Sequence, residues 1–132
     1  MLLNADSLKP LYVQIAEWIE NEILNGNILG DEKVYSQYQL ADMFNINPAT
    51  AAKGLNMLAD EQLLYKKRGL GMFVSSSARE AIRSKRVNRN LRQLARDLVS
   101  EASRLAVSED DLTRIIKEAI IQLREEVKHE SH

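Results

Sequence analysis

The chain has 132 residues, a length typical of one domain or of one small domain with an extension. It contains no cysteine, which excludes a disulfide framework and a thiolate metal site. No basic, apolar leader opens the sequence and no window approaches the ~18 apolar residues of a membrane span, so we expect a cytoplasmic protein.

Charge is distributed unevenly, although the net charge is only −1. Lysine and arginine gather at 66–68 and again at 79–96, where Glu80 is the only acid. A polyanion senses local clusters of this kind rather than the overall charge. We expect most of the second cluster to be solvated or paired with acids, and Arg79 and Arg83 to be its members most available to a polyanion.

The first predicted element is a helix between Pro10 and Gly26. Apolar residues recur at steps of four along one face, at Leu11, Ile15, Ile19 and Ile23. Proline suits a first helical turn and glycine a C-terminal stop.

A short second helix is predicted after Ser36. Ser36 and Gln39 have the spacing of a capping box, and an apolar face follows, made of Leu40, Ala41, Met43 and Phe44. Asn45 suits the left-handed turn that ends such a helix.

A third helix is predicted to start at Asn47, which caps it, with Pro48 in the first position, where a missing amide donor costs nothing. Its inward face is Ala51, Leu55 and Leu58. The outward face is made of small residues and of side chains that can reach phosphates or base edges, namely Asn47, Thr50, Lys53 and Asn56. Such a face fits a major groove ~12 Å wide, although similar helix pairs also occur in small cores that bind no nucleic acid.

Residues 64–74 predict a β-hairpin with Arg68, Gly69, Leu70 and Gly71 at its turn. In an isolated hairpin, consecutive cations beside glycines are usually a solvated turn. Here three helices precede the hairpin, which is the order of a winged helix-turn-helix. In that arrangement Lys66, Lys67 and Arg68 supply charge for phosphates, and the glycines let the backbone approach the duplex.

Two long amphipathic helices complete the chain, one over about 78–106 and one after the cap formed by Ser108 and Asp111. Each leaves an apolar stripe that a second copy can cover, so we predict a homodimer. The predicted dimerisation residues are Leu91, Leu94, Leu98, Ala102, Leu105, Leu112, Ile116, Ile120 and Leu123. The fold is thus expected to be mainly α with a small β-hairpin. A winged helix-turn-helix domain would span residues 1–76 and a two-helix dimerisation segment residues 77–132.

The sequence offers no catalytic motif, so we expect neither an enzyme nor a bound metal or cofactor. The two histidines, His129 and His132, form an i, i+3 pair in the final segment KHESH, a pattern that rarely binds a metal by itself. Two alternatives to simple DNA binding stay open. A small-molecule effector could bind in a cleft between dimer arms, or the winged helix could bind proteins and never touch DNA.

The segments "PLYVQIAEWIENEILNGNI" and "SQYQLADMFNINPATAAKGLNMLADEQLLYKKRGLGMFV" resemble the DNA-binding domain of the GntR family of bacterial transcription regulators, over about residues 10–74. The Asn-Pro of "NPATA" and the short two-helix tail are similar to the YtrA-like subfamily. The resemblance implies a dimeric repressor on a palindromic operator of double-stranded DNA, often beside genes for an ABC transporter.

The resemblance also implies which residues contact DNA. At the start of the second helix they are Ser36, Gln37 and Tyr38; in the third helix they are Asn47, Pro48, Ala49, Thr50 and Lys53; in the wing they are Arg68, Gly69, Leu70 and Gly71. Three arginines common in the wider family are replaced here by Tyr38, Pro48 and Ala52. Each good bidentate base contact discriminates by ~1–3 kcal/mol, so this chain is expected to read another sequence or to depend more on the wing and on DNA shape.

Overall fold

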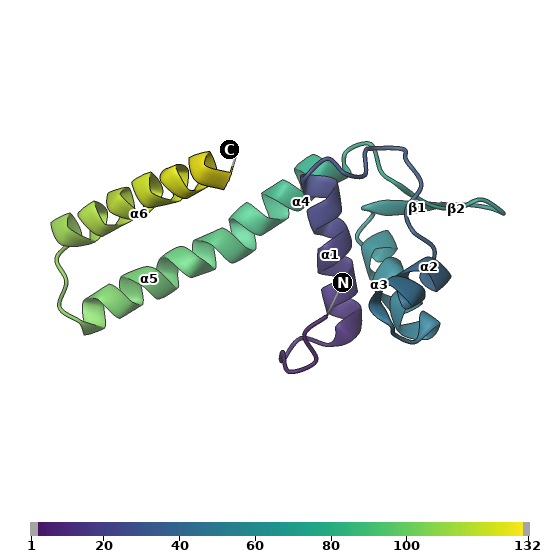
Figure 1. Cartoon of the computed structure of the whole chain (residues 1–132), viewed down its shortest axis with the longest axis horizontal. Coiled ribbons are helices and arrows are strands. Elements are labelled where there is room, and N and C mark those ends of the chain that lie inside the picture. The colour runs from purple at the N-terminus through teal and green to yellow at the C-terminus, as the bar shows by residue number, and fades with distance from the viewer. Residues whose placement is uncertain (1–2, 131–132) are drawn as a thin grey trace. The chain divides into compact units, whose positions relative to one another are not determined.

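The computed structural model describes residues 3–130; His132 lies outside this range. The chain divides into two compact units, Met1–Val87 and Asn88–His132. In chain order the elements are α1 (Leu11–Leu24), α2 (Gln37–Phe44), α3 (Pro48–Asp60), β1 (Leu64–Lys67), β2 (Gly71–Val74), α4 (Ala78–Arg86), a π-helical turn (Val87–Leu91), α5 (Arg92–Arg104) and α6 (Glu109–Glu130) (Figure 1). The predicted class, mainly helical with one small hairpin, is confirmed.

The core of the first unit lies between α1, α2 and α3, and both other helices pack against α3. Ile15, Ile19 and Ile23 of the predicted stripe are buried, whereas Leu11 is half-buried at the start of α1. Leu40 of α2 and the inward residues of α3 fill the other side of this core. Each aliphatic side chain buried in this way stabilises the unit by about 1.5–3 kcal/mol.

The ends of α2 and α3 are fixed by the side chains that the sequence predicts. Ser36 Oγ accepts from the amide of Gln39, and Gln39 Oε1 accepts from the amide of Ser36 at 2.8 Å, which completes the capping box. Asn45 ends α2 with a left-handed φ of 53°. Asn47 Oδ1 accepts from the amide of Ala49 at 2.8 Å, and Pro48 occupies the first turn of α3. Local chemistry therefore sets the turn between the two helices.

Gly54 determines how closely α3 approaches α1. A Cβ atom at this position would lie 2.8 Å from the carbonyl oxygen of Tyr12 and 3.0 Å from Ile15 Cγ2. Backbone atoms cannot yield as a flexible side chain can, so only glycine allows this crossing. The first turn of α1 consequently lies directly beside the middle of α3.

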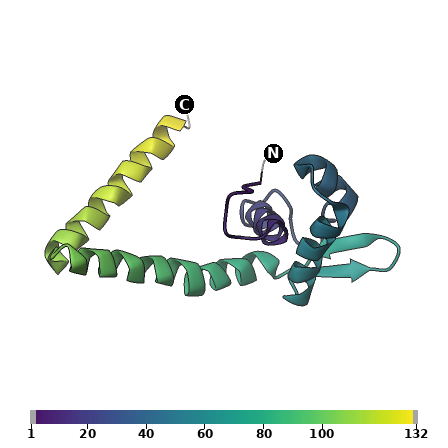
Figure 2. The same cartoon turned by 90° about the horizontal axis from the view of Figure 1, so that it is seen from below.

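The hairpin is antiparallel, with Leu64 opposite Val74 and Lys67 opposite Gly71. Gly71 therefore belongs to β2 rather than to the turn where the sequence placed it, because its backbone pairs with the last residue of β1. Leu64 and Val74 are buried at the base, while residues 66–71 are exposed and extend beyond the helices (Figure 2). Lys33 adds an isolated bridge to Phe73 that the sequence did not predict.

The first unit ends later than the predicted boundary at residue 76. Ala78 and Ile82, one turn apart on α4, are buried in the same core, and α4 packs on α1. Two apolar residues are too few to distinguish α4 from the polar helix that follows it. The sequence pattern therefore placed both of them in the C-terminal segment. The predicted helix over 78–106 is also interrupted, since the π-helical turn separates α4 from α5.

The second unit consists of α5 and α6. Ser108 Oγ accepts from the amide of Asp111 at 3.2 Å, which confirms the predicted cap. Ala102 is buried and Leu112 half-buried, whereas the other predicted dimerisation residues are exposed, namely Leu91, Leu94, Leu98, Leu105, Ile116, Ile120 and Leu123. Within one copy, the apolar stripes of both helices thus remain largely uncovered. None of the helices formed by residues 3–130 is long and apolar enough to cross a membrane.

Candidate nucleic-acid interface

Three segments distant in sequence meet around a hollow of about 350 Å³ on the first unit. The start of α2, one side of α3 and the outer half of the hairpin supply its lining, which consists of Tyr35, Ser36, Gln37, Ala52, Leu55, Asn56, Lys66, Gly71 and Met72. Ser36, Gln37, Lys66 and Gly71 were all predicted from the sequence to contact DNA. The fold therefore brings the predicted contacts of α2 together with those of the wing.

A second, open hollow of about 680 Å³ follows the outer face of α3. It is lined by Tyr12, Gln37, Ala49, Ala52, Lys53, Asn56, Met57, Asp60 and Glu61. Gln37, Ala52 and Asn56 border both hollows, so the two form one continuous surface. We call this surface, with the exposed tip of the hairpin, the α3–wing face.

The outer face of α3 carries mostly small side chains, as the sequence predicts. Asn47, Ala49 and Lys53 are exposed, while Pro48 and Thr50 are half-buried near the start of the helix. Because Asn47 serves as the cap, its side-chain oxygen is already engaged. The positive end of the helix dipole nevertheless lies at this exposed turn, where it favours an anion.

Two of the predicted contact residues, Tyr38 and Leu70, extend large side chains into solvent. Their exposed fractions are 67% for Tyr38, on the first turn of α2, and 59% for Leu70, at the tip of the hairpin. Gly69 and Gly71 on either side of Leu70 have φ values of +79° and +108°, which favour glycine. The tip is thus shaped by its backbone and leaves Arg68 and Leu70 free of the core.

Aromatic rings hold two lysines of the interface. The Lys67 ammonium lies 4.5 Å from the centre of the Phe73 ring and 5.9 Å from that of Tyr65. The Lys53 ammonium lies 4.1 Å from the centre of the Tyr12 ring. A ring attracts a cation without neutralising it, so both ammonium groups keep their full charge.

Tyr65 itself is held by Asp31. Its hydroxyl donates to Asp31 Oδ1 at 2.9 Å, and this hydrogen bond to a carboxylate raises the pKa of Tyr65 above its usual value of 10.0. The phenol consequently stays protonated and keeps its ring stacked on Phe73, with ring centres 5.9 Å apart. Asp31, in the loop before α2, thereby supports the two stacked rings that lie beside the Lys67 ammonium.

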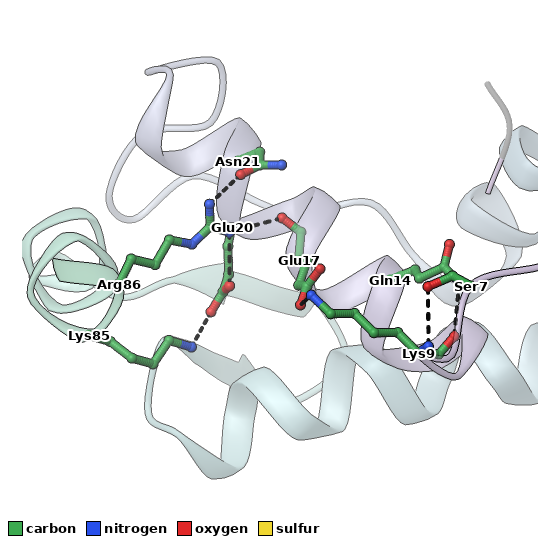
Figure 3. Close-up of polar contacts among 8 residues, drawn as sticks. All are labelled: Ser7, Lys9, Gln14, Glu17, Glu20, Asn21, Lys85 and Arg86. Atoms are coloured by element: carbon green, nitrogen blue, oxygen red, sulfur yellow. Dashed lines mark hydrogen bonds and ion pairs between the residues drawn. The ribbon is translucent and has the colours of Figure 1, made fainter. Parts of the chain in front are cut away.

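The second basic cluster has a different role from the first. Lys85 and Arg86 of α4 both pair with Glu20 of α1, which is only 4% exposed (Figure 3). Lys85 also pairs with Glu61 at 2.8 Å, and Arg86 donates to Asn21. This confirms the expected pairing with acids of the first domain. These two cations stabilise α4 on α1 and are not available to a polyanion.

Burial lowers the pKa of Lys85, but the hydrogen bonds and charges of Glu20 and Glu61 outweigh it and raise the pKa above its usual 10.5. Lys85 is therefore charged over the whole physiological range. Arg83 lies outside this cluster and pairs with Glu80 on its own helix, at 3.5 Å.

Sequence reasoning missed Tyr12 and Lys33 as neighbours of the interface. Tyr12 lies beside the predicted core stripe of α1, and only the crossing of α1 and α3 shows that it borders Lys53. Gly54 was a usable signal, since a glycine in mid-helix often marks a close approach. Lys33 gave no signal, because a single bridge outside any strand leaves no pattern.

A capped helix-turn-helix followed by an antiparallel wing, with the exposed faces of both joined in one surface, defines the winged helix-turn-helix class of DNA-binding proteins. Residues 11–74 match the family described as bacterial regulatory proteins, gntR family, and the chain belongs to this family. Residues 11–74 thus form a DNA-binding domain of the kind found in this family.

Known relatives support this assignment over the whole chain and over the domain alone. The HTH-type transcriptional repressor YtrA of Bacillus subtilis is 27% identical over 88% of each chain, which confirms the YtrA-like resemblance. The HTH-type transcriptional repressor NagR of Bacillus subtilis is 36% identical over 61% of this chain. This chain spans only 33% of the length of NagR.

Solved structures show the same fold. A GntR family transcriptional regulator from Listeria monocytogenes superposes with a TM-score of 0.70 at 27% identity, covering 86% of this chain and 97% of that one. The DNA-binding domain of AraR, in complex with its operator ORX1, superposes with a TM-score of 0.53 at 32% identity over 57% of this chain and 95% of that one. That structure is a domain of this fold bound to duplex DNA.

Proposed function

We propose that this chain is a homodimeric repressor of transcription that acts in the bacterial cytoplasm on a palindromic operator. The observation that carries the proposal is the α3–wing face. It places a small-residue helix, the start of α2 and a basic hairpin on one surface. In this proposal α3 enters a major groove, and Lys66, Lys67 and Arg68 neutralise phosphates beside it.

The uncovered stripes of α5 and α6 support the dimer. Leu94, Leu98, Ile116 and Ile120 are 39–64% exposed in a single copy, and they follow one face of each helix. A contiguous apolar face of this extent is typical of an interface. With two-fold symmetry, two α3 helices would enter major grooves ~34–36 Å apart, one helical turn, which is why the operator is expected to be a palindrome.

The absence of arginine from α2 and α3 shapes the proposed specificity. Tyr38, Pro48 and Ala52 stand where wider-family members commonly have guanidinium groups, and Lys53 is the only cation of α3. We therefore expect the wing and the shape of the DNA to contribute a large share of the affinity. The YtrA-like resemblance extends the proposal to an operator beside ABC-transporter genes.

A second function, sensing of a small molecule by the dimer arms, stays a prediction. The α5 surface has an open hollow of about 690 Å³ lined by Ala95, Arg96, Val99, Ser100, Ser103 and Arg104. A ligand that shifts DNA affinity must bind one state of the dimer better than the other. A thermal-shift screen of the DNA-free protein would reveal such a ligand as a raised unfolding temperature.

The test of the proposed function uses the full chain and two duplexes. One carries the inverted repeat found upstream of the gene, and the other has the same base composition in scrambled order. We expect the dimer, sized by light scattering, to bind the repeat at least tenfold more tightly in a titration followed by fluorescence anisotropy. Equal binding of both duplexes would contradict the operator, and no binding at low salt would contradict DNA binding altogether.

A further inference from the structure

Lys53 is the only lysine or arginine of α3, and it lies in the middle of the exposed face. Its ammonium lies 4.1 Å from the centre of the Tyr12 ring, which belongs to α1. The ion pairs formed among residues 3–130 do not include Lys53, although Asp60 and Glu61 line the same hollow. Its contact is thus with a ring and not with a carboxylate.

This difference matters for a polyanion. A carboxylate partner would cancel the charge of the ammonium and would have to be displaced before a phosphate or a base acceptor could bind. A ring restricts the position of the ammonium and leaves its charge and its three donors available. Restricting a long side chain before binding also reduces the conformational entropy that is lost when the complex forms.

The position of Tyr12 is built into the fold. Its carbonyl oxygen lies against Gly54, whose missing side chain lets α1 and α3 approach closely, and its side chain is half-buried. The backbone of Tyr12 therefore cannot move away from α3 without separating two core helices. Its half-buried ring extends from this fixed point toward Lys53.

We propose that Tyr12 is a positioning residue of the DNA interface: its ring holds the Lys53 ammonium on the outer face of α3, ready for a hydrogen-bond acceptor of the duplex. The inference rests on the proposed DNA-binding face and extends it to α1, outside the helix-turn-helix and the wing. The acceptor is either a phosphate oxygen or the O6/N7 edge of a guanine.

The experiment is a double-mutant cycle on DNA affinity, with Tyr12→Leu, Lys53→Met and the double variant. The probes are a labelled mixed-sequence duplex at low salt and the duplex enriched from a randomised library by the wild-type protein. We expect Tyr12→Leu to weaken binding about two- to fivefold, the size of an exposed cation–π contact, in the wild-type background and to have no effect beside Lys53→Met. Tyr12→Phe keeps the ring and should bind like the wild type.

The two probes distinguish the two acceptors. A phosphate contact predicts equal weakening on both duplexes, and a guanine contact predicts a larger loss on the enriched duplex. A purely structural role of Tyr12 would lower the unfolding temperature and weaken binding equally with and without Lys53, which would overturn the inference. So would unchanged affinity of Tyr12→Leu. If the wild-type protein binds neither duplex, the proposed function fails first.

Discussion

At the scale of single residues, the interface depends on cations that the fold keeps unneutralised. Replacing Lys67 and Arg68 together by glutamine should weaken binding to every duplex about equally, because phosphate contacts carry no sequence information. The plot of log affinity against log salt should become less steep by about one to two units, since each lost phosphate contact removes ~0.9. Anisotropy titrations at several salt concentrations measure this slope.

The matched control neutralises Lys117 and Arg124, two exposed cations of α6 outside its apolar stripe. It changes the net charge equally and should leave the slope unaltered. A slope that responds equally to both double variants would mean that overall charge, and not the wing, determines the affinity.

At the scale of elements, Gly54 sets the packing of α3 on α1. Alanine favours a helix by up to ~1 kcal/mol over glycine, but here its Cβ would lie 2.8 Å from the backbone oxygen of Tyr12. Overpacking of this kind costs ~1–3 kcal/mol, so the steric effect should outweigh the propensity. We expect Gly54→Ala to lower the free energy of unfolding in urea. Asn56→Ala, on the exposed face of the same helix, should not lower it.

The cluster around Glu20 attaches α4 to α1, and the stability of the first unit should therefore depend on pH in the alkaline range. The pKa of Lys85 is raised in the folded state, so its contribution is complete below the unfolded value of 10.5 and is lost as the pH rises through the higher folded value. Urea unfolding on both sides of pH 10.5 should therefore show a steeper loss for the wild type than for Lys85→Met.

Lys9→Met is the control for this pH dependence. The Lys9–Glu17 pair is also short, at 2.7 Å, but Lys9 is 58% exposed. An exposed pair contributes only ~0–1 kcal/mol, so this variant should keep the wild-type profile. Identical profiles for Lys85→Met and the wild type would contradict the role of the buried cluster.

The elements that local chemistry determines were predictable from the sequence. Ser36, Asn45, Asn47 and Ser108 act through neighbours within four residues, and each has the predicted role. The misplaced domain boundary and the overlooked Tyr12 depend on contacts between segments far apart in sequence. One sequence cannot reveal such contacts, because nothing in the local pattern of α1 says which helix will cross it.

At the scale of the whole molecule, DNA binding should require two copies. Ile116→Glu with Ile120→Glu places two charges on the exposed stripe of α6, and burying an unpaired charge in an interface is costly. We expect light scattering to show a monomer and the titration to show a loss of operator affinity. Ile121→Glu is the matched control, since residue 121 lies on the opposite side of the helix.

Two results would contradict this prediction. A monomeric wild-type protein would remove the basis for a palindromic operator, and a dimer that tolerates both charges would place the interface elsewhere. Circular dichroism separates these outcomes from unfolding, because a dissociated but folded chain keeps the helical signal of its first unit.

Different residues of α3 form the core and the exposed surface, and this separation has a practical consequence. Ala51, Gly54, Leu55 and Leu58 build the core, whereas Ala49, Lys53 and Asn56 lie on the exposed surface and contribute little to it. Target choice and foldability are thus encoded at different positions of one helix. A library randomised at the exposed positions alone should consist largely of folded proteins, which makes this small chain a scaffold for reprogramming operator preference without re-engineering its stability.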